Sequence, residues 1–306
     1  MQLFAKCYII DLLDLRRKIM LHVIYNPVAG KKTALKNLET VERTFRERGI
    51  GYEVHKTCDV HDAETIARRL TESGETELIV LGGDGTLHEV LNGIQDPTVC
   101  SLGLIPSGTG NDFAEKAGIS LDAEEAIRTI LDGEAKPTDY LEVGGVRCMN
   151  IAGLGIDVDV LERCQRGKLR GKLKYVKSLI ESLFSYKGIK VRFEKDGETL
   201  TREVLIAATC NGAQFGGGIK ICPAAEIDDG KIDVVLVDCI GSVFKIVKAF
   251  MVLMKGGILE YPLTTYFRCE KVHFTTEKPC TVQLDGELYN HVDFDVEIKK
   301  GLKFFR

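Results

Sequence analysis

Short apolar runs alternate with segments of helical periodicity over the first part of the chain. The apolar runs are 21–25, 52–55, 78–81 and 102–105, each the length of one buried strand. Two segments between them, 33–48 and 62–71, carry apolar residues three and four positions apart, and glycines follow where helices should end. This alternation predicts βαβ units that form an open parallel sheet with helices on both faces.

Beyond about residue 136 the pattern changes to β-branched runs joined by Gly, Asp and Asn. The expected strands are 191–194, 201–208, 232–237, 271–275, 280–284 and 292–298, and helices are expected at 168–184 and 242–254. This pattern predicts a second, mostly antiparallel domain of the β-sandwich type. We expect an N-terminal extension at 1–19, either dispensable or the product of an upstream start codon, an α/β domain at 20–138 and a β-rich second domain at 139–299, with 300–306 able to return to the first domain.

Composition narrows the class of protein. The 306 residues carry 41 Lys and Arg against 45 Asp and Glu, a net charge of −4, which argues against a dedicated nucleic-acid binder. No apolar run reaches the roughly 18 residues of a membrane-spanning helix, so we expect any membrane contact to be peripheral. The ten cysteines include no C-x-x-C pair, and no secretory signal is evident, which favours reduced thiols and the cytoplasm. The six histidines form no recognisable ligand set.

Three glycine-rich segments follow strands of the predicted sheet. They are Gly82-Gly83-Asp84-Gly85-Thr86, 105–114 with the sequence IPSGTGNDFA, and 25–33 with the sequence YNPVAGKKT. Glycines at a strand end let the backbone approach a polyphosphate, and the N–H groups of a helix start point at its charge. Neither a Walker A loop nor G-x-G-x-x-G is present. Taken alone, the first segment also fits a tight turn with Asp84 as a helix cap. The ends of neighbouring parallel strands should bring all three segments to one crevice.

These segments resemble a known family. Gly82-Gly83-Asp84-Gly85-Thr86-x-x-Glu89-x-x-Asn92-Gly93, followed by Pro106-x-Gly108-Thr109-x-Asn111-Asp112-Phe113-Ala114, is similar to the diacylglycerol kinase catalytic superfamily, specifically its small bacterial lipid kinases (YegS/BmrU-like). Three further motifs resemble it in the same order: 150–157, 211–233 and 284–287. The resemblance implies an N-terminal sheet like that of NAD kinase and phosphofructokinase, and a lipid kinase that uses ATP and Mg²⁺.

The resemblance also implies residue roles. Glu287 would accept the proton of the lipid hydroxyl, with Asp84 as the alternative acceptor. Glu226, Asp229 and the Lys231 carbonyl would form a structural magnesium site. The residues implied in nucleotide binding are Asn26, Thr57, Gly83, Asp84, Gly85, Thr86, Leu87, His88, Glu89, Thr109, Asn111 and Asp112.

The chemistry of phosphoryl transfer is consistent with these residue roles. It needs positioned phosphates, a cation that neutralises their charge and a carboxylate near the attacking hydroxyl. Spacing alone would favour an ordinary turn with solvated acids at Glu226 and Asp229, and a plain hairpin turn at 285–287. NAD kinases share the Gly-Gly-Asp-Gly core, so a kinase of a soluble acceptor such as NAD stays open, as does a nucleotide-binding regulator with little turnover. The sequence leaves the acceptor lipid and the oligomeric state, a dimer included, undecided.

A basic segment could bring the protein to its substrate. Residues 166–177 hold six Lys and Arg and no acid, beside an apolar stripe of helical spacing. Such a helix can lie on an anionic membrane surface, or it can pack its stripe on the second domain with a solvated basic face. The apolar stripe of 242–254 is expected to be core rather than a lipid tunnel.

Overall fold

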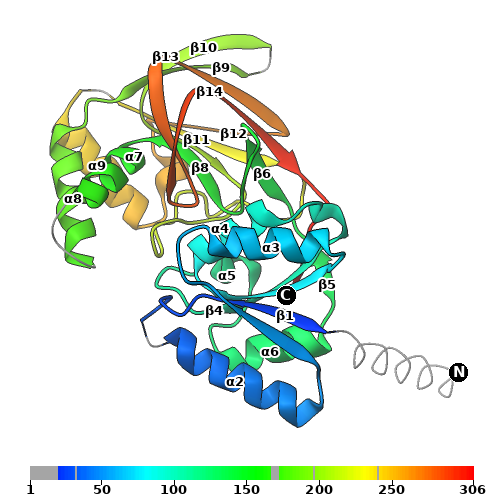
Figure 1. The fold of residues 1–306 in the computed structure, drawn as a ribbon. Coiled ribbons are helices and arrows are strands. Elements are labelled where there is room, and N and C mark those ends of the chain that lie inside the picture. Colours follow the sequence, from blue (N-terminus) through cyan, green and yellow to red (C-terminus); the bar gives the residue numbers. More distant parts are fainter. Residues whose placement is uncertain (1–19, 32, 167–171, 196, 240) are drawn as a thin grey trace, which may run out of the picture. The chain divides into compact units, whose positions relative to one another are not determined.

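The computed structural model describes residues 20–306 except 32, 167–171, 196 and 240 (Figure 1). The chain divides into two compact units. Unit 1 holds the described residues up to Pro137 together with Gly301–Arg306, and unit 2 holds Thr138–Lys300.

Unit 1 is built on a six-stranded sheet in the order β2-β1-β3-β4-β15-β5. Its strands are β1 (Leu21–Tyr25), β2 (Tyr52–Lys56), β3 (Glu77–Gly82), β4 (Ser101–Pro106), β5 (Ala135–Pro137) and β15 (Lys303–Phe305). The pairings from β2 to β15 are parallel, and only β5 runs antiparallel to its neighbour. The predicted parallel sheet is therefore confirmed. The chain's last residues complete it, because β15 lies between β4 and β5.

Helices of unit 1 follow the apolar spacing of the sequence. They are α2 (Thr33–Arg48), α3 (Asp62–Glu72), α4 (Asp84–Gly93), α5 (Asp112–Ala117) and α6 (Ala123–Asp132), with a short 3₁₀ turn η1 at Pro97–Val99. Helix α2 buries Ala34, Asn37, Val41 and Phe45, which are three or four positions apart. Asp122 caps α6 by accepting the N–H groups of Glu124 and Glu125.

Unit 2 is built on a nine-stranded sheet whose strand pairs are all antiparallel. The order is β12-β11-β10-β8-β13-β14-β6-β7, and β9 pairs with both β10 and β13. The strands are β6 (Tyr140–Val143), β7 (Val146–Cys148), β8 (Ile151–Gly155), β9 (Ile189–Lys195), β10 (Glu198–Cys210), β11 (Ile232–Asp238), β12 (Thr264–Cys269), β13 (Lys271–Leu284) and β14 (Glu287–Lys299). The mostly antiparallel second domain is confirmed.

The strands of unit 2 differ from the sequence prediction in two ways: β6, β7, β8 and β12 were not predicted, and two predicted strands are one. The two expected strands 271–275 and 280–284 are parts of the single strand β13, whose register with β14 shifts between Thr275 and Cys280. A bulge allows one strand to continue past residues that break the alternation, so the pattern reads as two strands.

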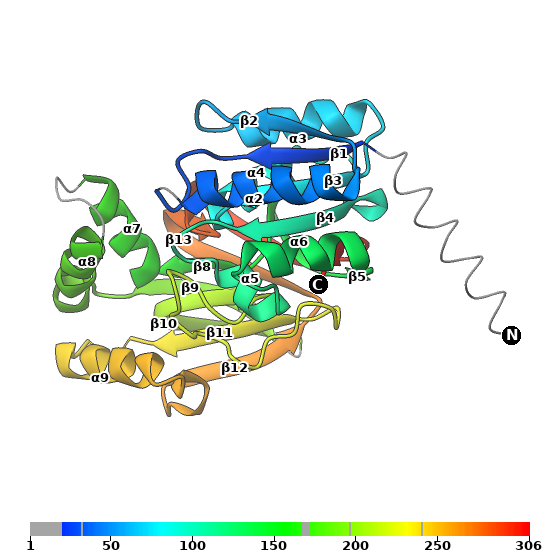
Figure 2. The ribbon, with the colours of Figure 1, turned by 90° about the horizontal axis from the view of Figure 1, so that it is seen from below.

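Three helices of unit 2, α7 (Ile156–Arg166), α8 (Lys172–Ser185) and α9 (Val243–Met254), gather at one end of its sheet (Figure 2). A 3₁₀ turn, η2 (Ile258–Glu260), follows α9. The predicted basic segment 166–177 runs through 167–171, which lie outside the described residues. Within the described residues, no helix combines the length and apolar character needed to cross a bilayer. Every cysteine in that part of the chain is free.

Candidate functional site

The glycine-rich segments that follow β1, β3 and β4 come together in unit 1. Asn26, directly after β1, donates its amide N–H to the Thr86 hydroxyl in α4 at 2.9 Å. The Ser107 N–H, directly after β4, donates to the Gly82 carbonyl at the end of β3 at 2.7 Å. Because these strands are neighbours in one parallel sheet, their carboxyl ends form one continuous edge, as the sequence led us to expect.

Glycine is required where these segments touch. A Cβ atom added to Gly108 would lie 2.6 Å from the Cα of Gly83, and one added to Gly83 would lie 2.8 Å from the Cα of Gly108. Gly30 has φ of +55°, and its added Cβ would lie 2.0 Å from the Ser107 carbonyl oxygen. Such backbone-to-backbone approach leaves no room for a side chain, so N–H groups of neighbouring segments can face one ligand.

Two carboxylates point to the same place in this region. A Cβ atom added to Gly110 would lie 3.0 Å from Asp84 Oδ2 and 3.2 Å from Asp112 Oδ2. Asp84 Oδ1 also accepts the Phe113 N–H at 3.2 Å, which ties the start of α4 to the start of α5. Two carboxylate oxygens close to one position beside Gly110 suit a hard divalent cation such as Mg²⁺, so Asp84 and Asp112 could hold one.

The other residues assigned to nucleotide binding differ in exposure. Gly85 and Thr109 are exposed, whereas the side chains of Thr57, Leu87 and His88 are buried, with Leu87 and His88 contributing to the packing of α4. Those buried residues could contact a nucleotide only through their backbone or across a small exposed edge.

Two more of the assigned side chains have local structural partners. Glu89 accepts the Ala63 N–H at the start of α3 at 3.2 Å, so it acts as a helix cap. Asn111, at φ of +55°, accepts the Gly108 N–H and donates to the Gly108 carbonyl, which fixes the segment after β4. Their roles toward a nucleotide stay predictions.

The predicted structural magnesium site lies on the loop before β11 in unit 2. Glu226 and Asp229 share this loop, and Asp229 accepts the Lys231 N–H at 3.0 Å. The Asp229 carboxylate also forms an ion pair with Arg268, which lies 3.3 Å from buried Asp233 as well. A metal ion bound through Asp229 would share this carboxylate with the Arg268 guanidinium, and the structural magnesium site stays a prediction.

The predicted proton acceptor, Glu287, is exposed at the start of β14. The two-residue turn before it has φ of +53° at Asp285 and +92° at Gly286, which is typical of a tight hairpin turn. Asp285 anchors the turn: its carboxylate accepts the N–H groups of Met149, Asn150 and Ile151 at 2.6, 2.8 and 3.3 Å. The sequence analysis gave Asp285 no role, because its partners lie about 135 positions away along the chain.

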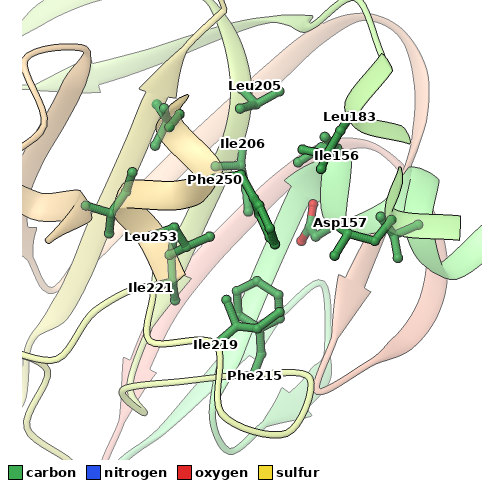
Figure 3. Close-up of a pocket in the computed structure, with 15 residues that line it drawn as sticks. Ile156, Asp157, Leu183, Leu205, Ile206, Phe215, Ile219, Ile221, Phe250 and Leu253 are labelled. Atoms are coloured by element: carbon green, nitrogen blue, oxygen red, sulfur yellow. The ribbon is translucent and has the colours of Figure 1, made fainter. Parts of the chain in front are cut away.

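An apolar pocket lies in unit 2 among α7, α8, α9 and strands β10 and β11 (Figure 3). About 550 Å³ of space without atoms lies among the side chains that line it, a volume that includes space open to solvent. The lining is apolar except for Asp157: Ile156, Asp157, Val160, Leu179, Leu183, Leu205, Ile206, Phe215, Ile219, Ile221, Val237, Ala249, Phe250, Leu253 and Ile258.

Asp157 is the polar group of this pocket, at the start of α7. Its side chain is buried, and among the described residues no well-aligned hydrogen bond reaches either carboxylate oxygen, although the Val158 N–H and the Gln283 amide lie near enough to favour its charged form. Burial raises the pKa of Asp157 to about 6, with the nearby Val158 N–H and Gln283 amide opposing the shift. A carboxylate with unused acceptor capacity in an apolar pocket suits a ligand that is mostly apolar and carries a hydroxyl group.

Gln283 links this pocket to the turn that carries Glu287. Gln283 Nε2 and Asp157 Oδ2 both lie beside Gly153. A Cβ atom added to Gly153 would be 3.2 Å from Gln283 Nε2 and 2.6 Å from Asp157 Oδ2. Gln283 Oε1 accepts the Gly286 N–H at 2.9 Å. One side chain therefore spans from the polar end of the pocket to the hairpin turn directly before Glu287.

Sequence analysis missed the pocket. The stripe of α9 expected to be core is only partly so: Ile246 and Ala249 are buried, whereas Val243 and Met254 are exposed. Ala249, Phe250 and Leu253 of the same helix line the pocket. Apolar periodicity does not distinguish a helix packed on a core from one that lines a hollow, since both bury one face.

Two buried histidines of unit 1 form a further group of polar side chains. His22 Nδ1 lies 3.0 Å from His55 Nε2, and the exposed carboxylate of Glu53 lies 3.8 Å from both rings. These donors are of the kind that Zn²⁺ accepts. The ring-to-ring hydrogen bond and the Arg69 guanidinium, 3.3 Å from His55 Nδ1, already provide polar partners, and we assign no metal to them.

Comparison with known proteins identifies the family. Residues 20–143 match the family model of the diacylglycerol kinase catalytic domain, and residues 150–302 match that of the YegS C-terminal NAD kinase beta sandwich-like domain. The chain belongs to the diacylglycerol kinase catalytic-domain family. Both family models match in one chain, and the resemblance read from the motifs is confirmed.

Individual proteins that are similar to this chain support the same family. The chain is 32% identical over 280 residues to the "Probable lipid kinase YegS-like" of Xanthomonas euvesicatoria pv. vesicatoria, covering 88% of this chain and 90% of that one. It is 29% identical over 274 residues to the "Diacylglycerol kinase" of Bacillus subtilis (strain 168), covering 87% and 88%. The crystal structure of a diacylglycerol kinase from Bacillus anthracis str. Sterne has the same fold, with a TM-score of 0.71 at 22% identity over 94% of this chain and 96% of that one.

Proposed function

We propose that this protein transfers the γ-phosphate of ATP to the hydroxyl group of diacylglycerol or a related lipid, giving phosphatidic acid or its analogue. Membership of the lipid kinase family supports the reaction class. The observation that carries the choice of a lipid acceptor is the apolar pocket of unit 2 with one buried carboxylate. A soluble, highly charged acceptor such as NAD would gain nothing from an apolar lining of this kind.

The nucleotide would bind at the carboxyl ends of β1, β3 and β4. There the first N–H groups of α4 point out of the helix with no intrahelical partner, and the positive end of a helix favours the negative charge of a triphosphate. Asp84 and Asp112 would hold a Mg²⁺ ion against the phosphates, where its charge offsets the charge that develops during transfer. Asn26 and Asn111 support this region through the hydrogen bonds described above.

The acceptor would place its acyl chains in the apolar pocket and its polar head toward Asp157. The reacting hydroxyl oxygen forms a bond to the γ-phosphorus while the bond from that phosphorus to the β,γ-bridging oxygen breaks, and ADP leaves. The hydroxyl proton passes to Glu287, whose exposed carboxylate follows the Asp285–Gly286 turn. Gln283 supports this assignment, because it connects the polar end of the pocket to the same turn.

The experiment is an acceptor screen with γ-labelled ATP and the full-length protein. We expect label in diacylglycerol presented in detergent micelles and none in NAD. Asp84→Asn should lower that transfer at least about a hundredfold, since it removes a proposed cation ligand, while circular dichroism shows a folded protein. Transfer to NAD would establish the soluble-acceptor alternative. Nucleotide binding without transfer to either acceptor would favour a regulator and contradict the proposal.

A further inference from the structure

Helix α9 has two apolar faces with different surroundings. Its inner face includes Ala249, Phe250 and Leu253, which line the apolar pocket. Its outer face presents Phe244, 84% exposed, and Met251, 55% exposed. An exposed phenylalanine and methionine seven positions apart form a stripe on one side of the helix, and large apolar side chains gathered in this way mark a contact surface.

Lysines lie on the same stripe. Lys248 and Lys255 are exposed and follow Phe244 and Met251 by four positions each, so the four side chains share one side of the helix. The sequence from 242 to 257 contains no Asp or Glu. The outer face of α9 is therefore apolar and positively charged together.

The neighbouring helix α8 also has exposed apolar side chains on the side away from the pocket. Leu179 and Leu183 line the pocket, whereas Ile180 is 49% and Phe184 is 64% exposed. Helices α8 and α9 pack against each other within unit 2. We name six residues of the two outer faces the docking face: Ile180, Phe184, Phe244, Lys248, Met251 and Lys255.

We propose that the docking face binds the surface of an anionic lipid bilayer and lets the acceptor pass from the bilayer into the pocket. The role in acceptor delivery rests on the proposed function, because a water-insoluble acceptor does not leave the membrane. Apolar side chains of an interfacial helix enter the boundary between headgroups and acyl chains, while its lysines contact anionic headgroups. The helices that would touch the bilayer are the same helices whose opposite faces line the pocket.

The positive charge of the docking face favours an anionic bilayer, rather than a second copy of this chain, as its binding partner. In a two-fold symmetric dimer through the docking face, Lys248 and Lys255 would approach the same lysines of the other copy. Helix α9 contains no acid, and the exposed acid of α8, Glu181, already lies 3.6 Å from Lys177 of the same helix. An anionic bilayer supplies the opposite charge across the whole face.

The experiment is co-sedimentation of the full-length protein with two kinds of vesicle, phosphatidylcholine alone and an equal mixture of phosphatidylcholine and phosphatidylglycerol. Phe244→Ser combined with Met251→Ser should weaken binding to the mixed vesicles at least about tenfold, from the lost apolar burial. Lys248→Glu combined with Lys255→Glu should weaken it at least about twenty-fivefold, at about fivefold for each lysine. The charge variant should also lose the decline in binding that added salt causes in the unaltered protein.

Matched controls lie in unit 1. Leu121 is 63% exposed and Lys36 is exposed on α2, so Leu121→Ser and Lys36→Glu should bind the mixed vesicles like the unaltered protein. Vesicle binding that is equally strong in the docking-face variants would overturn the proposal. Sedimentation velocity without vesicles gives a second test. The proposal would also be overturned if the unaltered protein is a dimer and the Phe244→Ser, Met251→Ser variant is a monomer, because the docking face would then join two copies.

Turnover of a water-soluble, short-chain diacylglycerol separates this proposal from the proposed function. We expect all the variants to phosphorylate that acceptor at the rate of the unaltered protein, since none of the altered residues lines the pocket. If the unaltered protein does not phosphorylate it, the proposed function fails, and the vesicle measurement still decides whether the face binds membranes.

Discussion

The Asp285 carboxylate accepts the backbone N–H of Asn150 at 2.8 Å and thereby ties the β13–β14 turn to the segment between β7 and β8. Its neighbours Met149 and Ile151 donate to the same carboxylate. An ionised acceptor forms stronger hydrogen bonds than a neutral one, so this carboxylate holds in place the turn that directly precedes Glu287.

Asp285→Asn tests this anchor. Asparagine tolerates the positive φ of +53° at this position, so the change removes charge and one acceptor oxygen without adding backbone strain. We expect the free energy of unfolding in urea to fall by about 3 kcal/mol, because buried N–H groups lose a charged partner. The matched change Asp295→Asn, at an exposed position of β14, should cost less than about 1 kcal/mol. Equal losses in the two variants would show that Asp285 does not anchor the turn.

The pH dependence of stability tests the environment of Asp157. Burial raises its pKa from 3.8 to about 6, so the folded protein binds this proton more tightly than the unfolded chain does. The contribution of this group to the free energy of unfolding is therefore largest below pH 4 and declines as pH rises through 6. Asp157→Asn should be more stable than the unaltered protein at pH 7.5 by up to about 3 kcal/mol, and the difference should shrink toward pH 4. A difference that does not change with pH contradicts an elevated pKa.

Gly108→Ala tests the close approach of the segments after β3 and β4. The added Cβ would fall 2.6 Å from the Cα of Gly83, so the two segments must separate. We expect the dissociation constant for a non-hydrolysable ATP analogue, measured by calorimetry, to rise at least about tenfold, because the N–H groups no longer face one phosphate. Gly51→Ala is the control, since its nearest atom would be Met20 Sδ at 3.6 Å. Unchanged affinity in Gly108→Ala would place the phosphates elsewhere.

Glu287→Gln tests the proposed proton acceptor. Removing a general base lowers kcat by about a hundredfold to ten-thousandfold. Because Glu287 is exposed, we expect the free energy of unfolding to change by less than about 0.5 kcal/mol. Glu198→Gln, also exposed, should keep full activity. If kcat is preserved in Glu287→Gln, the proton goes to another group, and Asp84 is the next to test.

Filling the pocket tests the acceptor site. Ile219→Trp enlarges a side chain at the lining of the pocket, so we expect KM for a long-chain diacylglycerol to rise at least about tenfold, while KM for ATP stays the same. Leu35→Trp, at a half-exposed position of α2, should change neither constant. A higher KM for ATP in Ile219→Trp would point to a general loss of structure rather than to an acceptor site.

The sequence by itself determined the two architectures and the family. Apolar runs of strand length alternating with helical periodicity specify a parallel sheet, and the order of the glycine-rich motifs is read directly along the chain. The meeting of Gly83 with Gly108 was also foreseeable, because neighbouring parallel strands must end at the same edge of their sheet.

Tertiary structure alone decided the pocket, the anchor and the outer face of α9. The pocket lining is drawn from several elements between Ile156 and Ile258, and Asp285 meets Asn150 across 135 positions. Local periodicity reports that a residue is apolar and which side of a helix it occupies. It does not report whether that side meets a packed core, a hollow or solvent, because this depends on elements that are distant along the chain.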